Sequence, residues 1–234
     1  MIEETDFETF LHVSKNKFQI FVFDIKKLEN LYFEELKVYN QFNFSDLNNL
    51  SKFLDENVYK IEKLVGNFIK NIILIIENEE NLQVNIAIKK KNYENSINQK
   101  YLKNNLTELK NIFKENYQEQ SIMHMVITNY IVDGKKNSTF TIDSDSGHFC
   151  LEVNFVSISN DLISTFDKLL ENYQIKIKQY MCGNYIKNFF YKDNDELSLM
   201  AHKLKNGQNN NEVILIPKNI ENRGFFERFF QLFS

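Results

Sequence analysis

The sequence feature that most restricts the fold is an unbroken apolar run, Ile-Ile-Leu-Ile-Ile, at residues 72–76. Side chains alternate between the two faces of a strand, so a run without polar residues fits a strand that is buried on both faces. Residues 82–88 then alternate apolar and polar side chains, which is typical of a strand with one wet face. The chain therefore predicts a sheet that contains both a buried strand and a half-exposed one.

The same two periods predict the other elements. We expect further strands at 18–24, 31–39, 121–132, 149–157 and 174–181, the first two as a hairpin. We expect helices at 45–68, 102–113, 162–173 and 193–204. Ser45 would cap the first helix, whose apolar stripe comprises Leu47, Leu50, Leu54, Ile61, Leu64 and Phe68. This order predicts an α+β fold, a mixed sheet with helices packed on one side.

The order of elements also predicts a division of the chain into consecutive parts. Residues 1–40 would form an N-terminal strand and hairpin region, and residues 41–190 the α+β domain. Residues 191–217 would be a short helix and linker, followed by an amphipathic helix at 218–234.

Residues 224–234 carry the strongest functional signal in the sequence. Wound as a helix, they place most of their phenylalanines on one face and polar residues opposite. A helix of this length is about 16 Å long, far short of the roughly 30 Å hydrocarbon core of a bilayer. The segment therefore fits a helix that lies on a membrane and does not cross it.

Charge near this tail favours an anionic lipid surface. Both arginines of the chain, Arg223 and Arg228, lie here. The predicted membrane-binding residues are Arg223, Phe225, Phe226, Arg228, Phe229, Phe230, Leu232 and Phe233. The alternatives are that the tail packs on the protein's own core or in a groove of a partner protein.

Composition excludes some classes of function and locates the protein. A net charge of −4 argues against a dedicated nucleic-acid binder, which usually carries a basic excess. Residues 1–10 are acidic and do not resemble a signal peptide. Cys150 and Cys182 lie far apart and outside any metal-binding spacing, as expected of small buried residues in a reducing compartment. We expect a cytoplasmic protein, peripheral on the inner face of the cell membrane.

The segment at 122–134 resembles a landmark of FtsA, the actin-like bacterial cell-division protein. In that family a strand of this pattern opens the second half of a small inserted subdomain, and His124, Tyr130, Val132 and Asp133 match it. The following strand, helix and strand at 150–157, 162–173 and 175–180, with a cap at Asn160 or Asp161, occur in the same order. The C-terminal amphipathic tail is similar too. The resemblance implies an SHS2-like (strand-helix-strand-strand) interaction subdomain that contacts other FtsA protomers or later divisome proteins.

The departures from that family matter equally. FtsA begins with a glycine-containing phosphate hairpin, whereas here Asp24 and Ile25 are followed by Lys26, Lys27 and Leu28. No second glycine-rich phosphate loop follows Tyr185. The resemblance therefore implies that the actin-like ATPase core is missing and that no nucleotide or other cofactor is bound.

Residues that could carry chemistry do not assemble into a predicted active site. His124 lies in an apolar strand, where a packed or hydrogen-bonded structural role is usual. His148 and Cys150 share one face of a strand, but a third metal ligand or an orienting acid cannot be placed. Asp143, Asp145 and Gly147 lack the bidentate acid of a calcium loop. The lysine clusters at 89–91 and 135–136 fit solvated strand ends. We predict no catalytic, metal or cofactor-binding residue.

These observations lead to one main interpretation and three alternatives. The main one is a non-catalytic peripheral-membrane adaptor of bacterial cell division, whose partners are divisome proteins and inner-membrane lipid. The first alternative is a similar adaptor of a pilus or secretion platform. The second is a small enzyme that uses His124, His148 or Cys150, and the third is a soluble interaction domain on which the tail packs.

Overall fold

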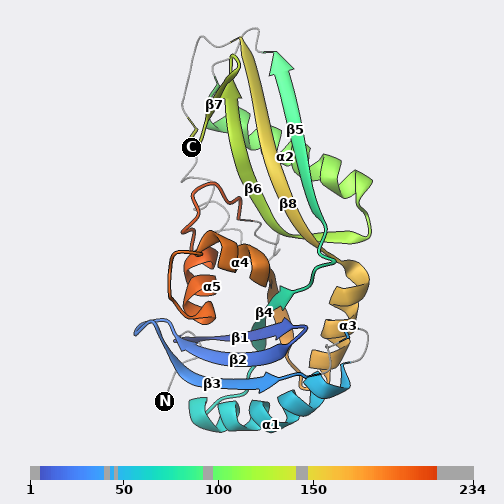
Figure 1. Ribbon diagram of the computed structural model, residues 1–234, viewed down its shortest axis with the longest axis vertical. Helices are drawn as coiled ribbons and strands as arrows, with labels where there is room; N and C mark the ends of the chain where they lie inside the picture. Colours follow the sequence, from blue (N-terminus) through green and yellow to red (C-terminus); the bar gives the residue numbers. More distant parts are fainter. Residues whose placement is uncertain (1–5, 40–42, 45–46, 92–96, 141–146, 215–234) are drawn as a thin grey trace. The chain divides into compact units, whose positions relative to one another are not determined.

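The computed structural model describes residues 6–39, 43–44, 47–91, 97–140 and 147–214 (Figure 1). The chain forms two compact units that are interleaved in sequence. The first unit comprises Met1–Asn81 and Ile158–Gln208, and the second comprises Leu82–Ser157 and Asn209–Ser234.

The first unit is built on a five-stranded mixed sheet with the order β3-β2-β1-β4-β9. Its strands are β1 (Phe7–Ser14), β2 (Lys17–Asp24), β3 (Glu29–Lys37), β4 (Asn71–Glu77) and β9 (Lys176–Cys182). Strands β1, β2 and β3 pair antiparallel, while β4 runs parallel to both β1 and β9. The apolar run predicted as a buried strand is β4, at the interior of this sheet, which confirms that prediction.

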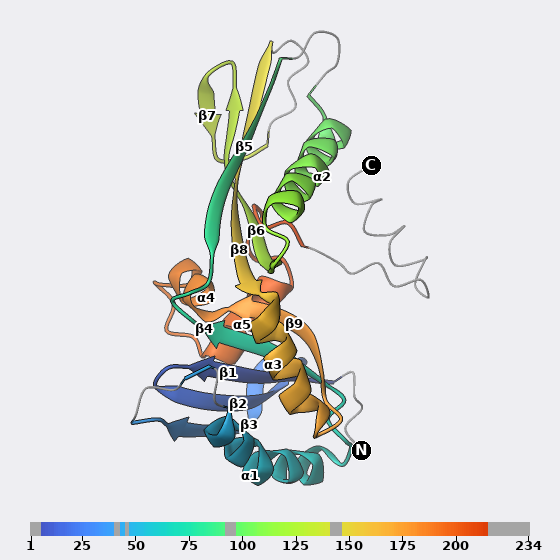
Figure 2. The same cartoon turned by 90° about the vertical axis from the view of Figure 1, so that its right-hand side faces the viewer.

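Helices cover both faces of this sheet (Figures 1 and 2). They are α1 (Asn48–Val65), α3 (Asn160–Glu171), α4 (Gly183–Phe189) and α5 (Leu197–Lys205). Helices α4 and α5 bury one face with Phe10, Phe23 and Ile75. Helices α1 and α3 lie on the other face, where Phe18 of β2 meets Phe53 of α1. The prediction of helices on one side only was wrong for this unit, because α1 and α3 lie on one face and α4 and α5 on the other. Helix α4 was not predicted.

In helix α1 the apolar stripe predicted from the sequence is longer than the face that the structure buries. Leu50, Leu54 and Ile61 are buried as predicted. Leu64 is half-exposed and Phe68 is 77% exposed, so these two do not belong to the core stripe. Helix α1 ends at Val65, since Gly66 adopts φ +74° at the C-cap and reverses the chain, so Leu64 lies in the last turn and Phe68 lies beyond the helix. Ser45, the predicted cap, lies outside the described residues.

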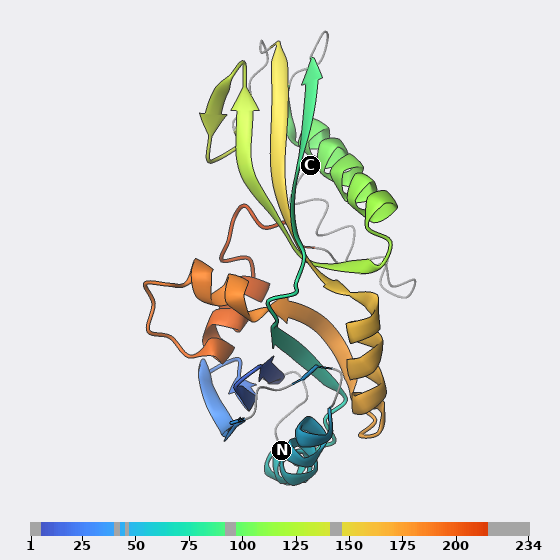
Figure 3. The ribbon, with the colours of Figure 1, turned by 45° about the vertical axis from the view of Figure 1, so that its right-hand side comes forward.

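The second unit has a four-stranded sheet with the order β5-β8-β6-β7 (Figure 3). Its elements are β5 (Gln83–Lys91), α2 (Gln99–Asn116), β6 (Gln120–Val132), β7 (Lys135–Asn137) and β8 (His148–Ser159). Helix α2 covers one face, where Phe113 stacks on Phe155 with ring centroids 4.8 Å apart. The opposite face is largely polar, as the alternating sequence pattern predicted.

The α+β class is confirmed, but the sheets divide the chain differently from the expected consecutive parts. The N-terminal strands do not form a separate region, because β1 pairs with β4 along five residue pairs. Strand β1 itself was not predicted. The predicted helix at 218–234 lies outside the described residues. Among the described helices, none is both long enough and apolar enough to span a bilayer.

Candidate functional site

The predicted membrane-binding residues all lie outside the described part of the chain, so that assignment remains a prediction. The structure instead shows how the chain approaches them. The amide of Ile127 donates to the carbonyl of Asn211 at 2.8 Å. The amide of Val213 donates to the carbonyl of Met125, also at 2.8 Å. The segment just before the tail is therefore held against β6 of the second unit.

His124 reinforces this attachment. Its ring is 1% exposed, and Nδ1 lies 2.6 Å from Glu212 Oε1 on the returning segment. Glu212 also forms an antiparallel bridge with Val126. His124 thus has the hydrogen-bonded structural position that its place in an apolar strand predicted.

A row of polar side chains crosses the first sheet near the carboxyl ends of its parallel strands. We call Glu35, Gln19, His12, Glu77 and Lys187 the Glu77 network. Gln19 Nε2 donates to Glu35 Oε2 at 2.7 Å, and Gln19 Oε1 lies 2.8 Å from His12 Nδ1. His12 Nε2 lies 2.8 Å from Glu77 Oε1, which also pairs with Lys187. Both ring nitrogens of His12 therefore lie within hydrogen-bond distance of side-chain oxygens.

This network stabilises the charged form of Glu77. Burial of the carboxylate alone would raise its pKa, because desolvation disfavours the charged form. Hydrogen bonds and charge from His12 and Lys187 outweigh burial and lower the pKa of Glu77 to about 2. Since His12 is fully buried, the pair depends on each partner for compensation.

Gly183 fits closely against the same carboxylate. A Cβ at this position would lie 2.5 Å from Glu77 Cγ and 3.0 Å from Oε1. Since His12 and Lys187 fix Glu77, we expect Gly183→Ala to lower the free energy of unfolding by about 1–3 kcal/mol. Urea denaturation measures this, with Gly147→Ala as control, because there the nearest atom is 3.6 Å away. Equal stability of Gly183→Ala and the wild type would contradict the close packing.

The position of this network bears on nucleotide binding. Ligands of open α/β sheets bind outside the carboxyl ends of parallel strands, and here β1, β4 and β9 end at Ser14, Glu77 and Cys182. Strands β1 and β2 form one hairpin between Ser14 and Lys17, and β2 and β3 form the predicted hairpin between Asp24 and Glu29. Asp24 ends β2, and its Oδ1 accepts from the amides of Lys26 and Lys27. Neither connection, at residues 14–17 or at residues 25–28, contains a glycine.

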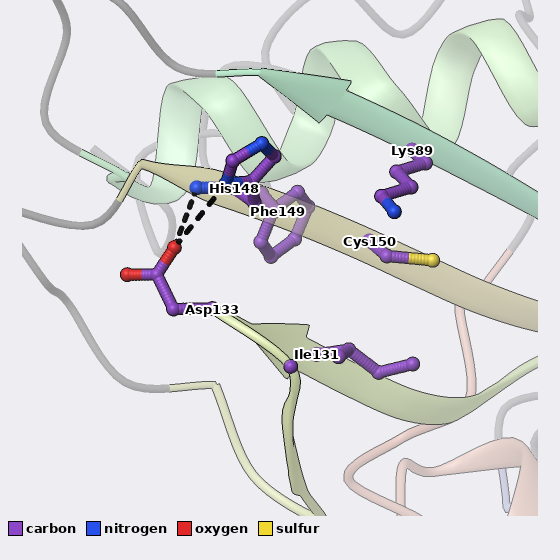
Figure 4. Close-up of a pocket in the computed structure, with 7 residues that line it drawn as sticks. Lys89, Ile131, Asp133, His148, Phe149 and Cys150 are labelled. Atoms are coloured by element: carbon purple, nitrogen blue, oxygen red, sulfur yellow. Dashed lines mark hydrogen bonds and ion pairs between the residues drawn. The ribbon is translucent and has the colours of Figure 1, made fainter.

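A hollow of about 410 Å³ lies on the second unit and gathers several predicted candidates (Figure 4). Its lining includes Lys89, Asp133, Gly134, His148 and Cys150. Asp133, with φ +46°, follows β6, and His148 begins β8. The structure therefore brings beside His148 an acid that sequence spacing could not place there.

The contacts in this hollow are those of a hydrogen-bonded turn, and they do not activate the Cys150 thiol as a nucleophile. The Asp133 carboxylate accepts from the backbone amides of His148 at 2.7 Å and Gly147 at 3.2 Å. The His148 ring Nδ1 is 3.7 Å from Asp133 Oδ1, beyond hydrogen-bond length. Burial and the Glu152 charge raise the pKa of the Cys150 thiol, so the reactive thiolate is disfavoured.

Among the residues that the structure describes, no group of three or more His, Cys, Asp or Glu side chains is placed to hold a metal ion. Asp143 and Asp145, which the sequence analysis weighed as calcium ligands, lie outside the described residues. The Gly147 amide donates a hydrogen bond to the Asp133 carboxylate.

The chain has no match among protein-family models or curated proteins. Its fold is similar to a solved structure of a PilM–PilN type IV pilus biogenesis complex, with a TM-score of 0.50 at 6% sequence identity. The similarity covers 78% of this chain and 49% of that one, so this chain spans about half its length.

Two other solved structures are more distant. One is a Bacteroides thetaiotaomicron protein with an actin-like ATPase fold and unknown function (TM-score 0.34, 13% identity, 82% of this chain and 60% of that one). The other is the cytoplasmic domain of EpsL, an inner-membrane component of the Vibrio cholerae type II secretion system (TM-score 0.34, 6% identity, 77% and 57%).

These likenesses concern the fold alone. The α+β arrangement is consistent with part of an actin-like fold. The expectation that the actin-like ATPase core is missing remains a prediction.

Proposed function

We propose that this chain is a non-catalytic, peripheral-membrane adaptor of a pilus or secretion platform. The observation that carries the proposal is the similarity in fold, over 78% of the chain, to a structure of a PilM–PilN complex in type IV pilus biogenesis. That complex joins two different proteins, and the proposal transfers to this chain the role of binding a partner in such a platform. This reverses the order of the two adaptor interpretations drawn from the sequence.

The Glu77 network supports a role without nucleotide turnover. Its side chains satisfy one another at the carboxyl ends of β1 and β4, and the hairpin between Ser14 and Lys17 has no glycine to bring its backbone close to a phosphate. The predicted lipid-binding tail would supply the peripheral attachment. The residues before it, Asn211 and Val213, are fixed on β6, so the tail would start from a defined point on the second unit.

The proposal is tested by purifying the full chain with its partners from membranes of its own cells. We expect inner-membrane proteins of a pilus or secretion platform, and we expect a chain without residues 224–234 to lose membrane association. Recovery of division proteins would instead favour the second candidate. Recovery of neither class would overturn the adaptor role.

The second candidate is an adaptor of cell division. It is favoured by the FtsA-like pattern of His124, Tyr130, Val132 and Asp133 along β6 and its turn. The same purification separates the two candidates by the partners recovered.

The enzyme alternative makes a separate prediction. Because the Cys150 thiol has a raised pKa and His148 makes no close contact with Asp133, we expect Cys150→Ser with His148→Ala to leave cellular function and partner recovery unchanged. Complementation of a deletion strain measures this. Loss of function with a normal unfolding curve would contradict the non-catalytic role.

A further inference from the structure

Helix α2, which covers one face of the sheet in the second unit (Figure 3), carries lysines along one side of its surface. At roughly 100° per residue, Lys100, Lys110 and Lys114 fall within an arc of about 80°. Lys100 and Lys114 are exposed and Lys110 is half-buried. We call these three residues the α2 lysine stripe. Lys103 falls on the same arc but makes a contact of its own, so it is not counted in the stripe.

The positive charges of the stripe are not compensated within the unit. No acid stands three or four residues from any of them, where a carboxylate would pair along a helix. In the described part of the chain none of the three forms an ion pair, and none has an interaction left unnamed. The stripe therefore presents unpaired positive charge on the surface of α2.

Two of the three lysines are placed where a helix disfavours them. Lys110 stands four residues from Lys114, a spacing at which like charges destabilise a helix. Burial and the charge of Lys114 lower the pKa of Lys110. Lys100 lies in the first turn, where the helix dipole opposes a positive charge and no acid is present. Only Lys114, in the last turn, is favoured by the dipole.

The acids of this region lie on another side of the helix. Glu108 is about 120° round the helix from Lys114, and it pairs with Lys90 of β5. Glu115 is about 100° from Lys114, and Glu119 lies beyond the end of the helix. Glu108 thus marks the side of α2 that faces β5. The stripe lies on the side that is turned away from β5.

The segment that leads to the predicted tail is attached at the edge of this sheet away from β5. Strand β5 forms one edge of the sheet, and Asn211 and Val213 bond to β6 ahead of the part that pairs with β7. Val213 packs against the core that α2 covers. The chain from Ile214 to Gly224 spans at most roughly 35 Å when extended. A tail on a bilayer would therefore hold the second unit close to that surface.

We propose that the α2 lysine stripe contacts the anionic headgroups of the bilayer, as a second lipid contact beside the tail. The stripe extends along about 21 Å of helix, so a flat anionic surface meets all three charges together. Linked contacts with one surface bind more strongly than either contact alone. The inference rests on the proposed peripheral-membrane function and names the face of the chain that meets lipid.

Vesicle binding of the full chain tests the proposal. Glutamine at all three stripe positions is expected to weaken binding to phosphatidylglycerol-containing vesicles about ten- to hundredfold, because each lysine near an anionic surface contributes about fivefold. Binding to neutral phosphatidylcholine vesicles is expected to stay unchanged. The matched control makes the same substitution at three exposed lysines of α1, namely Lys52, Lys60 and Lys63. It is expected to bind like the wild type.

Chemical acetylation of lysines maps the contact on the wild-type chain. Anionic vesicles are expected to protect Lys100 and Lys114 from a water-soluble acetylating reagent, while Lys52 and Lys60 stay reactive. Mass spectrometry of peptides measures the modification at each position. Neutral vesicles serve as the control and are expected to protect neither pair.

Urea denaturation separates a binding role from a structural one. Lys100→Gln with Lys110→Gln is expected to unfold at a urea concentration at least as high as the wild type, because both charges are unfavourable in the free helix. Glutamine keeps a similar helix propensity, so the substitution changes mainly the charge. Unfolding at a lower urea concentration would assign these lysines to the stability of the fold and overturn the proposal.

The remaining outcomes separate the stripe from the membrane function on which it rests. Equal losses in the stripe and control variants, or unchanged acetylation on anionic vesicles, would overturn the stripe. If Phe226→Asp with Phe230→Asp abolishes binding and the stripe variant binds normally, the stripe is wrong and the peripheral-membrane function stands. If the wild type binds no anionic vesicles, both are wrong. Reduced partner recovery from cells with normal vesicle binding would assign the stripe to an acidic protein instead.

Discussion

Replacing Phe226 and Phe230 by aspartate is expected to abolish binding of the full chain to anionic lipid vesicles. In a helix these two residues lie on the apolar face, so each substitution places a carboxylate where the acyl region should be. The negative charge also opposes attraction between Arg223, Arg228 and acidic headgroups. Both effects act in the same direction.

The size of the effect follows from the small net binding energy of such a tail. Each buried phenylalanine contributes about 1.5–3 kcal/mol, while ordering each backbone residue costs roughly 1–2 kcal/mol. Loss of two phenylalanines therefore removes about 3–6 kcal/mol, which is a hundredfold or more in Kd. Because the balance for one tail is small, stable attachment requires several copies acting together.

Co-sedimentation with anionic and neutral vesicles measures this. The matched control is Tyr59→Asp with Tyr191→Asp, which makes the same charge change at side chains that are 71% and 73% exposed on the first unit. We expect the control to bind like the wild type, with stronger binding of both to anionic vesicles. If the tail variant binds as well as the control, the tail is no membrane anchor and packs on protein instead.

The elements that were predicted well from the sequence are those that neighbouring residues determine. Residues 72–76 are apolar throughout and form buried β4, and the alternation that follows forms β5 with one wet face. The turn at Asp133 and Gly134 joins β6 to β7, and both residues adopt a positive φ that Asp and Gly tolerate. In each case a few neighbouring residues decide the conformation.

The parts that were missed depend on distant partners. Strand β1 contains Thr9 and His12, so it does not read as a buried strand, yet His12 is fully buried because Gln19 and Glu77 satisfy its ring. The division into two sheets was missed for the same reason. Strand β9, which completes the first sheet, lies about a hundred residues after β4 in the chain and pairs with it directly.

The candidate site shows the same limit. Sequence spacing placed His148 and Cys150 on one strand face, but only the fold shows Asp133 beside His148. The Glu77 network draws on three strands of the first sheet beyond β4 itself and on α4, so no local motif marks it. A helix as short as α4, with seven residues, leaves little periodic signal in the sequence.

Glu77→Gln is expected to be the most destabilising single substitution in that network. It removes the charge that compensates buried His12 and Lys187, and breaking a buried pair typically costs about 3–5 kcal/mol. Lys187 is 43% exposed and the glutamine amide still reaches His12, so we expect a loss of about 2–3 kcal/mol near neutral pH. Urea denaturation measures the difference in the free energy of unfolding.

The stability difference between the wild type and Glu77→Gln is expected to shrink as the pH falls. A carboxyl whose pKa is lowered on folding contributes stability above its unfolded pKa, and that stability is lost as the pH falls through the folded pKa. For Glu77 the folded pKa is about 2, and an unfolded glutamate has a pKa of about 4.3. The wild type should therefore lose its advantage over Glu77→Gln between about pH 5 and pH 2, and the two stability curves should converge in acid.

Glu79→Gln is the matched control, because it makes the same chemical change two residues away. Glu79 pairs with Lys15 at 2.8 Å but its side chain is 80% exposed, so water screens the pair and replaces the lost interaction. We expect this control to follow the wild-type curve closely at every pH. Parallel curves for the wild type and Glu77→Gln would mean that the charge of Glu77 does not stabilise the fold. Convergence confined to Glu77→Gln would instead establish that a buried, mutually compensated network fills the carboxyl edge of the first sheet.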